Sequence, residues 1–184
     1  KVELLNLFRV SQEHTITSVL SQVTEKWVWL EQLLSSNLKL KYLALTSLVV
    51  LYSLMVIGGY ISAAGLGLTC PDWPLCPNGI LPDDEYFIEW SHRLIAATTG
   101  VLVIATAVGS WITAGSHWKI RTTGTLAAIF VVTQITLGAL VIDTLLHAVL
   151  VSIHFGIGIL LFAMVLLTTL FAFRLKPKSI QTTA

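Results

Sequence analysis

Four long apolar runs constrain what this chain can fold into more than any other feature. Each run is long enough to cross the hydrocarbon core of a bilayer, which takes about 20 residues of α-helix. Lipid offers no hydrogen-bond partner to exposed backbone groups, so such runs must form helices. The sequence therefore predicts an all-α integral membrane protein, a bundle of four transmembrane helices near Tyr42–Ala63, Phe87–Ile112, Thr122–Ile142 and Leu145–Phe173.

The distribution of charge excludes several other classes of protein. Charged residues make up 11% of the chain, against about 25% in typical globular domains. Residues 42–173 hold only nine of the 21 charged side chains. This distribution excludes intrinsic disorder, a soluble enzyme and nucleic-acid binding through a basic surface. The expected surroundings are the lipid bilayer of a cell membrane, which the chain crosses several times.

Basic residues flank the spans on one side of the predicted membrane. They precede the first span, connect the second to the third, and follow the fourth: Lys39, Lys41, Lys119, Arg121, Arg174, Lys176 and Lys178. The segment 64–86, between the first two spans, has four acidic residues and no Lys or Arg. Because cytoplasmic flanks carry the excess of Lys and Arg, we predict that both termini are cytoplasmic and that the 64–86 loop is extracytoplasmic.

The spans divide the chain into three parts. Residues 41–174 form the predicted transmembrane domain, and residues 175–184 form a solvated cytoplasmic tail. Residues 1–40 are predicted to form an extra amphipathic helix, because their apolar residues alternate at spacings of three and four. These residues are Ile16, Leu20, Val23, Trp27, Leu30 and Leu34. Two interpretations stay open: the helix lies at the cytoplasmic membrane surface, or it docks onto another protein.

A proline-rich segment in the predicted extracytoplasmic loop carries both cysteines of the chain. It reads Cys70-Pro71-Asp72-Trp73-Pro74-Leu75-Cys76, and its prolines favour a compact loop. Disulfides persist on the oxidising side of a membrane, so a Cys70–Cys76 bridge is expected. The bridge either staples the loop over the bundle or takes part in thiol–disulfide exchange. A thiol-oxidising relay enzyme is disfavoured, because such enzymes need a C-x-x-C motif or a second cysteine pair.

Two of the five histidines lie inside predicted spans. His92 is near the start of the second span and His154 is about two turns into the fourth, so both fall in the outer half of the membrane. Ionisable residues within a membrane are costly and indicate function. Two imidazoles at similar depth on different helices suit bis-histidine heme ligation, with His92 and His154 binding the iron. The alternative is that each imidazole is buried and hydrogen-bonded to a neighbouring helix.

Three more residues accompany this pair. Glu89 lies one turn before His92, so its carboxylate is a candidate acid, base or heme-edge contact. Its alternative role is to face water or to pair with Arg93. The guanidinium group of Arg93 suits a heme propionate, because it forms bidentate hydrogen bonds with carboxylates. His147 shares a helix face with His154 and is a candidate ligand, propionate partner or interfacial residue.

Several motifs together resemble the heme A synthase family. They are Gly58-Gly59-Tyr60 with Gly65, Gly67 and Leu68, the cysteine loop, Glu89-Trp90-Ser91-His92-Arg93, Gln134-Ile135-Thr136-Leu137-Gly138-Ala139-Leu140 and His154. The resemblance covers roughly residues 42–173. Members of this family typically have eight spans in two similar four-helix halves, of which this chain has one. A homodimer is therefore expected, because a two-fold axis would supply the second half.

The resemblance implies a function and a set of site residues. Members of the family oxidise the C8 methyl of heme O to a formyl group and so make heme A for terminal oxidases. It implies His92 and His154 as axial ligands of a heme, which is heme b, heme O or heme A. It also implies Glu89 as the carboxylate near the methyl group, and a Cys70–Cys76 disulfide. Implied partners are the substrate heme O, heme O synthase and a terminal oxidase. Residues 1–40 lie outside the part that resembles the family, and they are the segment through which we expect contact with heme O synthase or the oxidase.

A second function is compatible with the same residues. The chain would then be a non-catalytic, heme-bearing subunit that passes electrons or supports assembly, docked on a respiratory oxidase through its N-terminal helix. The two hypotheses differ in the fate of the heme, which is oxidised in the first and unchanged in the second.

Overall fold

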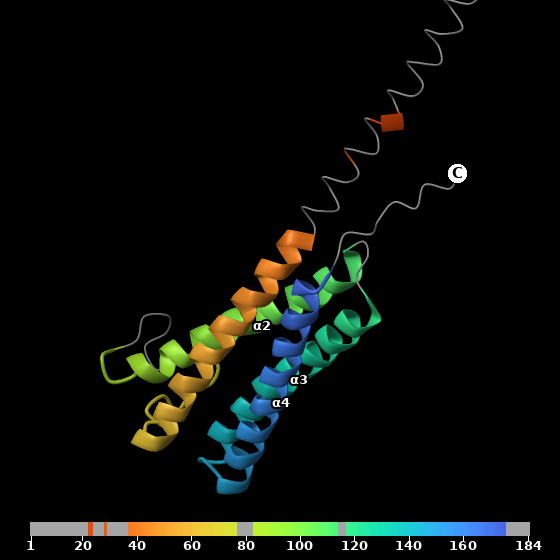
Figure 1. Cartoon of the computed structure of the whole chain (residues 1–184). Coiled ribbons are helices and arrows are strands. Elements are labelled where there is room, and N and C mark those ends of the chain that lie inside the picture. Colours follow the sequence, from red (N-terminus) through yellow and green to blue (C-terminus); the bar gives the residue numbers. More distant parts are fainter. Residues whose placement is uncertain (1–21, 24–27, 29–36, 77–82, 114–116, 176–184) are drawn as a thin grey trace, which may run out of the picture.

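The computed structural model describes residues 22–23, 28, 37–76, 83–113 and 117–175 of the chain (Figure 1). This described part contains four helices that are long and apolar enough to cross a membrane. They are the first span, Asn37–Ala64, followed by α2 (Phe87–Ile112), α3 (Trp118–Asp143) and α4 (Ala148–Phe173). The predicted all-α membrane fold is confirmed.

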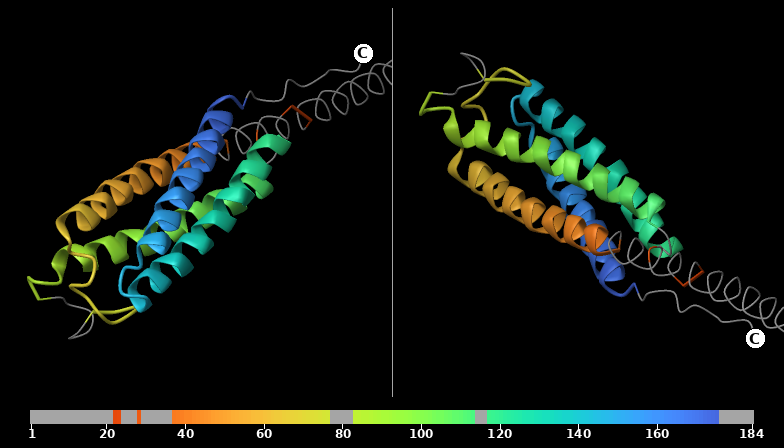
Figure 2. Two further views of the ribbon diagram at one scale, coloured as in Figure 1. Left: turned by 90° about the horizontal axis from the view of Figure 1, so that it is seen from below. Right: turned by 90° about the horizontal axis from the view of Figure 1, so that it is seen from above.

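The four helices alternate in direction within one elongated bundle, and α3 packs against both α2 and α4 (Figure 2). At one end the first span finishes, α2 begins and α3 passes into α4. We call this the disulfide end, because the Cys70–Cys76 loop lies there. The opposite end, where α3 begins and α4 finishes, we call the basic end.

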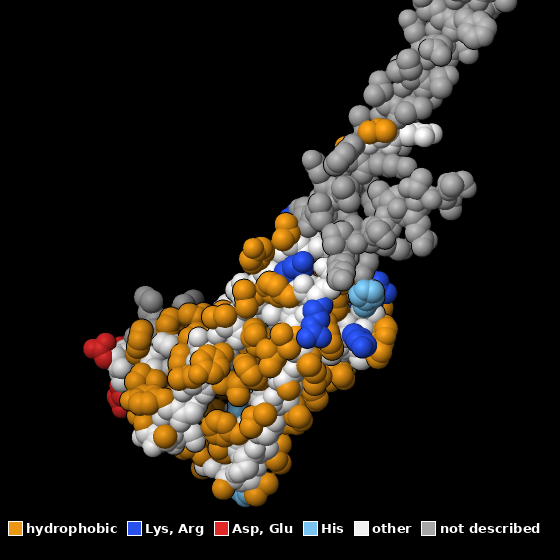
Figure 3. All heavy atoms as spheres, viewed as in Figure 1, with side chains coloured by type: hydrophobic (Ala, Val, Ile, Leu, Met, Phe, Trp, Pro, Cys, Tyr) orange, Lys and Arg blue, Asp and Glu red, His pale blue; other side chains and the backbone are white. Residues whose placement is uncertain are grey.

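Charge separates along the axis of the bundle. Figure 3 shows acidic side chains at the disulfide end, Lys and Arg side chains at the basic end, and a largely hydrophobic surface between them. An exposed apolar belt between two charged ends is the pattern of a membrane-spanning bundle. The side of the membrane that each end faces stays a prediction.

The helix bounds agree with the predicted spans except at three helix starts. The first span begins five residues before the predicted Tyr42, and α3 begins at Trp118, four residues before the predicted Thr122. The early start of α3 takes two basic residues into the helix, where each finds an aromatic ring. Lys119 Nζ lies 5.9 Å from the ring centroid of Phe171, and Arg121 Cζ lies 5.4 Å from that of Trp111.

The fourth helix begins three residues after the predicted start near Leu145. Leu145 and Leu146 have φ angles of 52° and 61°, in the left-handed region, and they form the turn between α3 and α4. Bulky residues seldom adopt this conformation, so two leucines give no signal of a turn. Their hydrophobicity favoured an extension of the helix instead. The turn puts the Leu146 side chain against Gly67, where an added Cβ would lie 3.0 Å from Leu146 Cδ2. Helix α4 therefore begins at Ala148.

The apolar core occupies the middle of the bundle and the basic end. The middle cluster consists of Leu51, Val103, Ala127, Val131, Leu161 and Val165. A second buried cluster near the basic end consists of Leu40, Ile120, Ala172 and Leu175. Both clusters draw residues from helices far apart in sequence, so they hold the bundle together as one unit.

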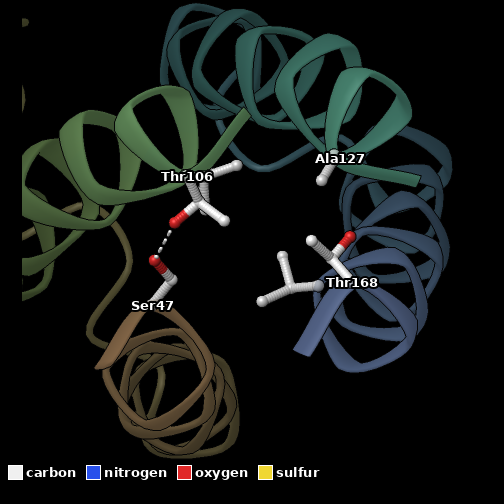
Figure 4. Close-up of a pocket in the computed structure, with 7 residues that line it drawn as sticks. Ser47, Thr106, Ala127 and Thr168 are labelled. Carbon is white, nitrogen blue, oxygen red and sulfur yellow. Dashed lines mark hydrogen bonds between the residues drawn. The ribbon is translucent and has the colours of Figure 1, made fainter. Parts of the chain in front are cut away.

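Hydroxyl groups link neighbouring helices between these clusters. The hydroxyl oxygens of Ser47 and Thr106 are 2.9 Å apart (Figure 4), and Thr168 donates to Thr123 Oγ1 at 2.8 Å. Such bonds add to helix association in lipid, where apolar contact alone gives little preference for protein over lipid. The cavity between Ser47, Thr106, Ala127 and Thr168 has a volume of only about 10 Å³, at the lower limit for one water. A large cofactor does not fit there.

The predicted amphipathic helix of residues 1–40 lies almost entirely outside the described residues. Gln22, Val23 and Val28 are helical and exposed. The heptad-like seam, and the choice between a membrane surface and a protein partner, stay predictions.

Candidate functional site

Two histidines and two glycines form a layer across the bundle near its disulfide end. His92 lies on α2 and His154 on α4, while Gly58 lies on the first span and Gly138 on α3. At 1.5 Å per residue, all four lie within about 10 Å of the helix end on that side. We call these four residues the histidine layer.

Both imidazoles have an unused nitrogen. The Nδ1 atoms of His92 and His154 are buried, and neither has a hydrogen-bond partner within the part of the chain that the structure describes. The alternative, in which each imidazole is hydrogen-bonded to a neighbouring helix, is therefore not seen at the two Nδ1 atoms. A buried polar atom without a partner carries a desolvation cost of about 1–3 kcal/mol. A ligand from outside the chain would offset that cost.

The donor set fits a heme better than a bare metal ion. The described residues contain no group of three or more His, Cys, Asp or Glu side chains arranged to hold a metal. Structural zinc usually needs four protein ligands, whereas a heme supplies four nitrogens of its own and needs only axial ligands. Two imidazoles at similar depth on separate helices match that need.

Gln134 of α3 holds the backbone of α4 at the position of His154. Its side-chain Nε2 donates to the carbonyl oxygen of His154 at 2.8 Å. Gly158 lies beside this amide, and a Cβ there would meet Gln134 Oε1 at 3.8 Å, an ordinary contact distance. The sequence marked Gln134 only as part of a motif, because a bond between residues 20 apart leaves no local pattern.

Replacing Gln134 with leucine should therefore lower stability. The variant loses the interhelical hydrogen bond while keeping similar volume, and we expect a decrease of about 1 kcal/mol in the free energy of unfolding. Unfolding in mixed micelles measures this decrease. Thr133→Val is the matched control, because Thr133 bonds only to Ile129 of its own helix and is not among the buried residues. Equal stability of the two variants would contradict a role for the Gln134 bond.

Glu89 and Arg93 attach α2 to the cysteine loop. Glu89 is 3% exposed, and its Oε2 accepts hydrogen bonds from Thr69 Oγ1 at 3.0 Å and from the Cys70 amide at 2.9 Å. Its Oε1 forms an ion pair with Arg93 Nη2 at 2.7 Å. Both carboxylate oxygens are thus engaged, and Glu89 lies one turn from His92 on the same helix.

Arg93 completes the attachment of the loop. Its Nη2 donates to the Cys70 carbonyl at 2.6 Å, and its Nη1 donates to the carbonyls of Asp72 and Pro74. The structure therefore contains the Glu89–Arg93 ion pair, which was the alternative role predicted for Glu89. Binding of Arg93 to a propionate stays a prediction.

Cys70 and Cys76 form the predicted disulfide. Both residues are buried, which limits the access of an attacking thiolate. Together with the Glu89 and Arg93 bonds to the same segment, this burial favours the interpretation that the bridge staples the loop. The sequence alone is compatible with either role.

The remaining predicted site residue, His147, lies apart from the layer. It is exposed and precedes the first residue of α4, about 10 Å along the helix axis from His154. Sequence reasoning did not assign roles to Thr69, Gly58 or Gln134. Their contacts are with residues far away in the chain, so no spacing rule could have identified them.

Comparison with known proteins connects these features to one family. The family model COX15-CtaA, described as cytochrome oxidase assembly protein, matches residues 81–184, more than half of the chain. This chain belongs to the COX15-CtaA family. The matched range contains Glu89, His92 and His154, and the predicted resemblance to heme A synthases agrees with the curated relatives.

Three such relatives are named heme A synthase. The protein of Bacillus licheniformis is 34% identical over 145 residues, which are 77% of this chain and 48% of that protein. The protein of Geobacillus thermodenitrificans is 31% identical over 150 residues, 77% of this chain and 47% of its own length. The protein of Bacillus mycoides is 33% identical over 147 residues, 76% and 46% respectively. The chain thus spans about half the length of the curated relatives that it matches.

Proposed function

We propose that this chain forms a heme-binding four-helix unit of a heme A synthase-type membrane oxidoreductase. Its substrate is heme O, whose C8 methyl it converts to a formyl group. The observation that carries the proposal is the histidine layer, in which two imidazoles at similar depth on different helices each keep a buried Nδ1 without a described partner. The names of the curated relatives support the same reaction.

The described residues divide into three roles under this proposal. His92 and His154 hold the iron of a heme b, heme O or heme A from opposite helices, and a bis-histidine iron supplies one-electron transfer when bound. Glu89 provides the negative charge that stabilises positive charge developing at the methyl carbon, or orients a water toward it. Arg93 and His147 lie toward the disulfide end, where they are the candidate hydrogen-bond partners of the heme propionates.

The charge separation of the bundle supports one arrangement in the membrane. The disulfide end faces the extracytoplasmic side, and both termini face the cytoplasm, where the Lys and Arg residues of the basic end meet the membrane surface. A second copy of the chain supplies a second four-helix unit in a homodimer. Residues 1–40 contact a terminal oxidase or heme O synthase.

One observation favours the second candidate function, a heme-bearing electron-transfer or assembly subunit. The carboxylate of Glu89 accepts from Thr69 and Cys70 and pairs with Arg93, so it already has a structural task. A unit that only transfers electrons needs the two imidazoles and no free carboxylate.

Identification of the bound porphyrins distinguishes the two functions. The chain is purified in detergent from cells that make heme O, its porphyrins are extracted in acid, and they are identified by chromatography and mass. The synthase predicts heme O together with hydroxylated or formylated products. Unmodified heme b alone would favour the electron-transfer subunit, and the absence of any heme would contradict both.

A further inference from the structure

Each histidine of the layer lies against a glycine from a helix that carries no candidate ligand. A Cβ atom added to Gly58 would lie 3.0 Å from Cε1 of His92 and 3.6 Å from its Nδ1. A Cβ atom added to Gly138 would lie 3.7 Å from Cε1 of His154. The His92 ring therefore takes up part of the space that a side chain at Gly58 would need, whereas a Cβ at Gly138 would meet the His154 ring at an ordinary van der Waals distance.

The cost of a side chain at Gly58 depends on whether the His92 ring is free to move. A carbon–carbon separation of 3.0 Å is well inside the optimum of about 3.5–4.0 Å, so an added methyl group would displace the ring. Cε1 is at the far end of the histidine side chain, so a small rotation of the side-chain torsions accommodates the methyl in the absence of heme. A ring that binds iron lacks this freedom, because the iron also has a second axial ligand and determines where the ring nitrogen must be.

We propose that Gly58 is a positioning residue for the His92 imidazole, whose ligating orientation requires the space that a side chain at Gly58 would fill. This inference rests on the proposed function, since it takes His92 to be an axial ligand. Gly138 has no equivalent role, because a Cβ there meets His154 only at ordinary contact distance.

Three substitutions of glycine by alanine test the proposal. Gly58→Ala places a methyl group against His92. Gly59→Ala adds the same methyl group and the same gain in helix propensity at a position where a Cβ has no atom within 4 Å. Gly138→Ala tests the looser contact with His154. The wild type and the three variants are purified with heme, and the electron paramagnetic resonance spectrum of the ferric state is recorded.

The spectrum of a bis-histidine iron reports the planes of its imidazoles and the strength of its axial bonds. We expect Gly58→Ala to shift the low-spin g values and to convert part of the signal to high spin, while Gly59→Ala and Gly138→Ala keep the wild-type spectrum. A wild-type spectrum from Gly58→Ala overturns the inference and leaves the proposed function intact. A wild type that binds no heme overturns both.

Unfolding of the heme-free proteins separates positioning from folding. Because the free ring can move aside, heme-free Gly58→Ala should unfold at the same denaturant concentration as heme-free Gly59→Ala. If Gly58→Ala unfolds much earlier than Gly59→Ala without heme, the methyl group disrupts helix packing, and the positioning role is wrong.

Discussion

Substitution of His92 or His154 by alanine should abolish stoichiometric heme binding. Under the proposed function each imidazole supplies one of two axial bonds, and the loss of either would leave the iron with a single protein ligand. Loss of a residue that merely supports a metal ligand costs roughly 10–100-fold in affinity, so loss of a ligand should weaken heme binding by at least about 100-fold. Absorption spectra of the purified variants and their pyridine hemochromes measure the remaining heme.

The fold should survive these substitutions, which distinguishes loss of a ligand from loss of structure. In the heme-free protein, each substitution removes a buried Nδ1 that lacks a partner within the described chain. The free energy of unfolding without heme should therefore fall little. His117→Ala is the matched control, since His117 is an exposed histidine that precedes α3 at the basic end. Wild-type heme content in His92→Ala or His154→Ala would refute the assignment of that residue as a ligand.

Glu89→Gln should abolish oxidation of heme O while the heme stays bound. The substitution removes the negative charge that we assign to stabilising the reacting methyl carbon. Loss of one electrostatic stabiliser typically costs about 10²–10³-fold in rate, and we expect a decrease of that size in the yield of formylated product. His92 and His154 are unchanged, so heme content should stay near that of the wild type.

The same carboxylate attaches the cysteine loop, and a second variant separates its two roles. Thr69→Val removes one donor to Glu89 Oε2 and keeps both the charge and the ion pair with Arg93. If Glu89 acts on the substrate, Thr69→Val should retain most of the activity that Glu89→Gln loses. Equal losses in both variants would indicate that Glu89 acts through the loop, and full activity in Glu89→Gln would exclude any need for the carboxylate.

The stability of the two variants provides an independent measure of the attachment. Removing one partner from a buried ion pair costs about 3–5 kcal/mol when the other charge is left alone. In Glu89→Gln, Arg93 keeps its bonds to three loop carbonyls. The substitution should therefore lower the free energy of unfolding by less than this amount. Thr69→Val should cost about 1 kcal/mol, the typical contribution of one hydrogen bond. Unfolding experiments on the heme-free proteins test this order.

Several features of the site could be predicted because they depend on composition or local spacing. The bounds of α2 agree with the predicted span, since an apolar run in lipid must be helical over its whole length. The Cys70–Cys76 bridge was expected from its loop. The pairing of Glu89 with Arg93 was one of two alternatives, because residues four apart share a helix face.

Other features depend on contacts between helices and left no signal in the sequence. The turn at Leu145 and Leu146 lacks the glycine or proline that usually marks such a turn. The bonds from Arg93 to the loop carbonyls, and from Gln134 to His154, join residues about 20 positions apart. The close contact of Gly58 with His92 joins two different helices.

The sequence by itself thus determined the number of spans, the separation of charge and the identity of the candidate ligands. These properties follow from the transfer of side chains between water and lipid, which depends on composition and not on the neighbours of a residue. The tertiary structure alone decided which faces of the helices meet. Apolar residues surround helices such as α4 on nearly all sides, so their hydrophobic pattern does not distinguish the face toward protein from the face toward lipid. Only close packing and hydrogen bonds between helices make that distinction.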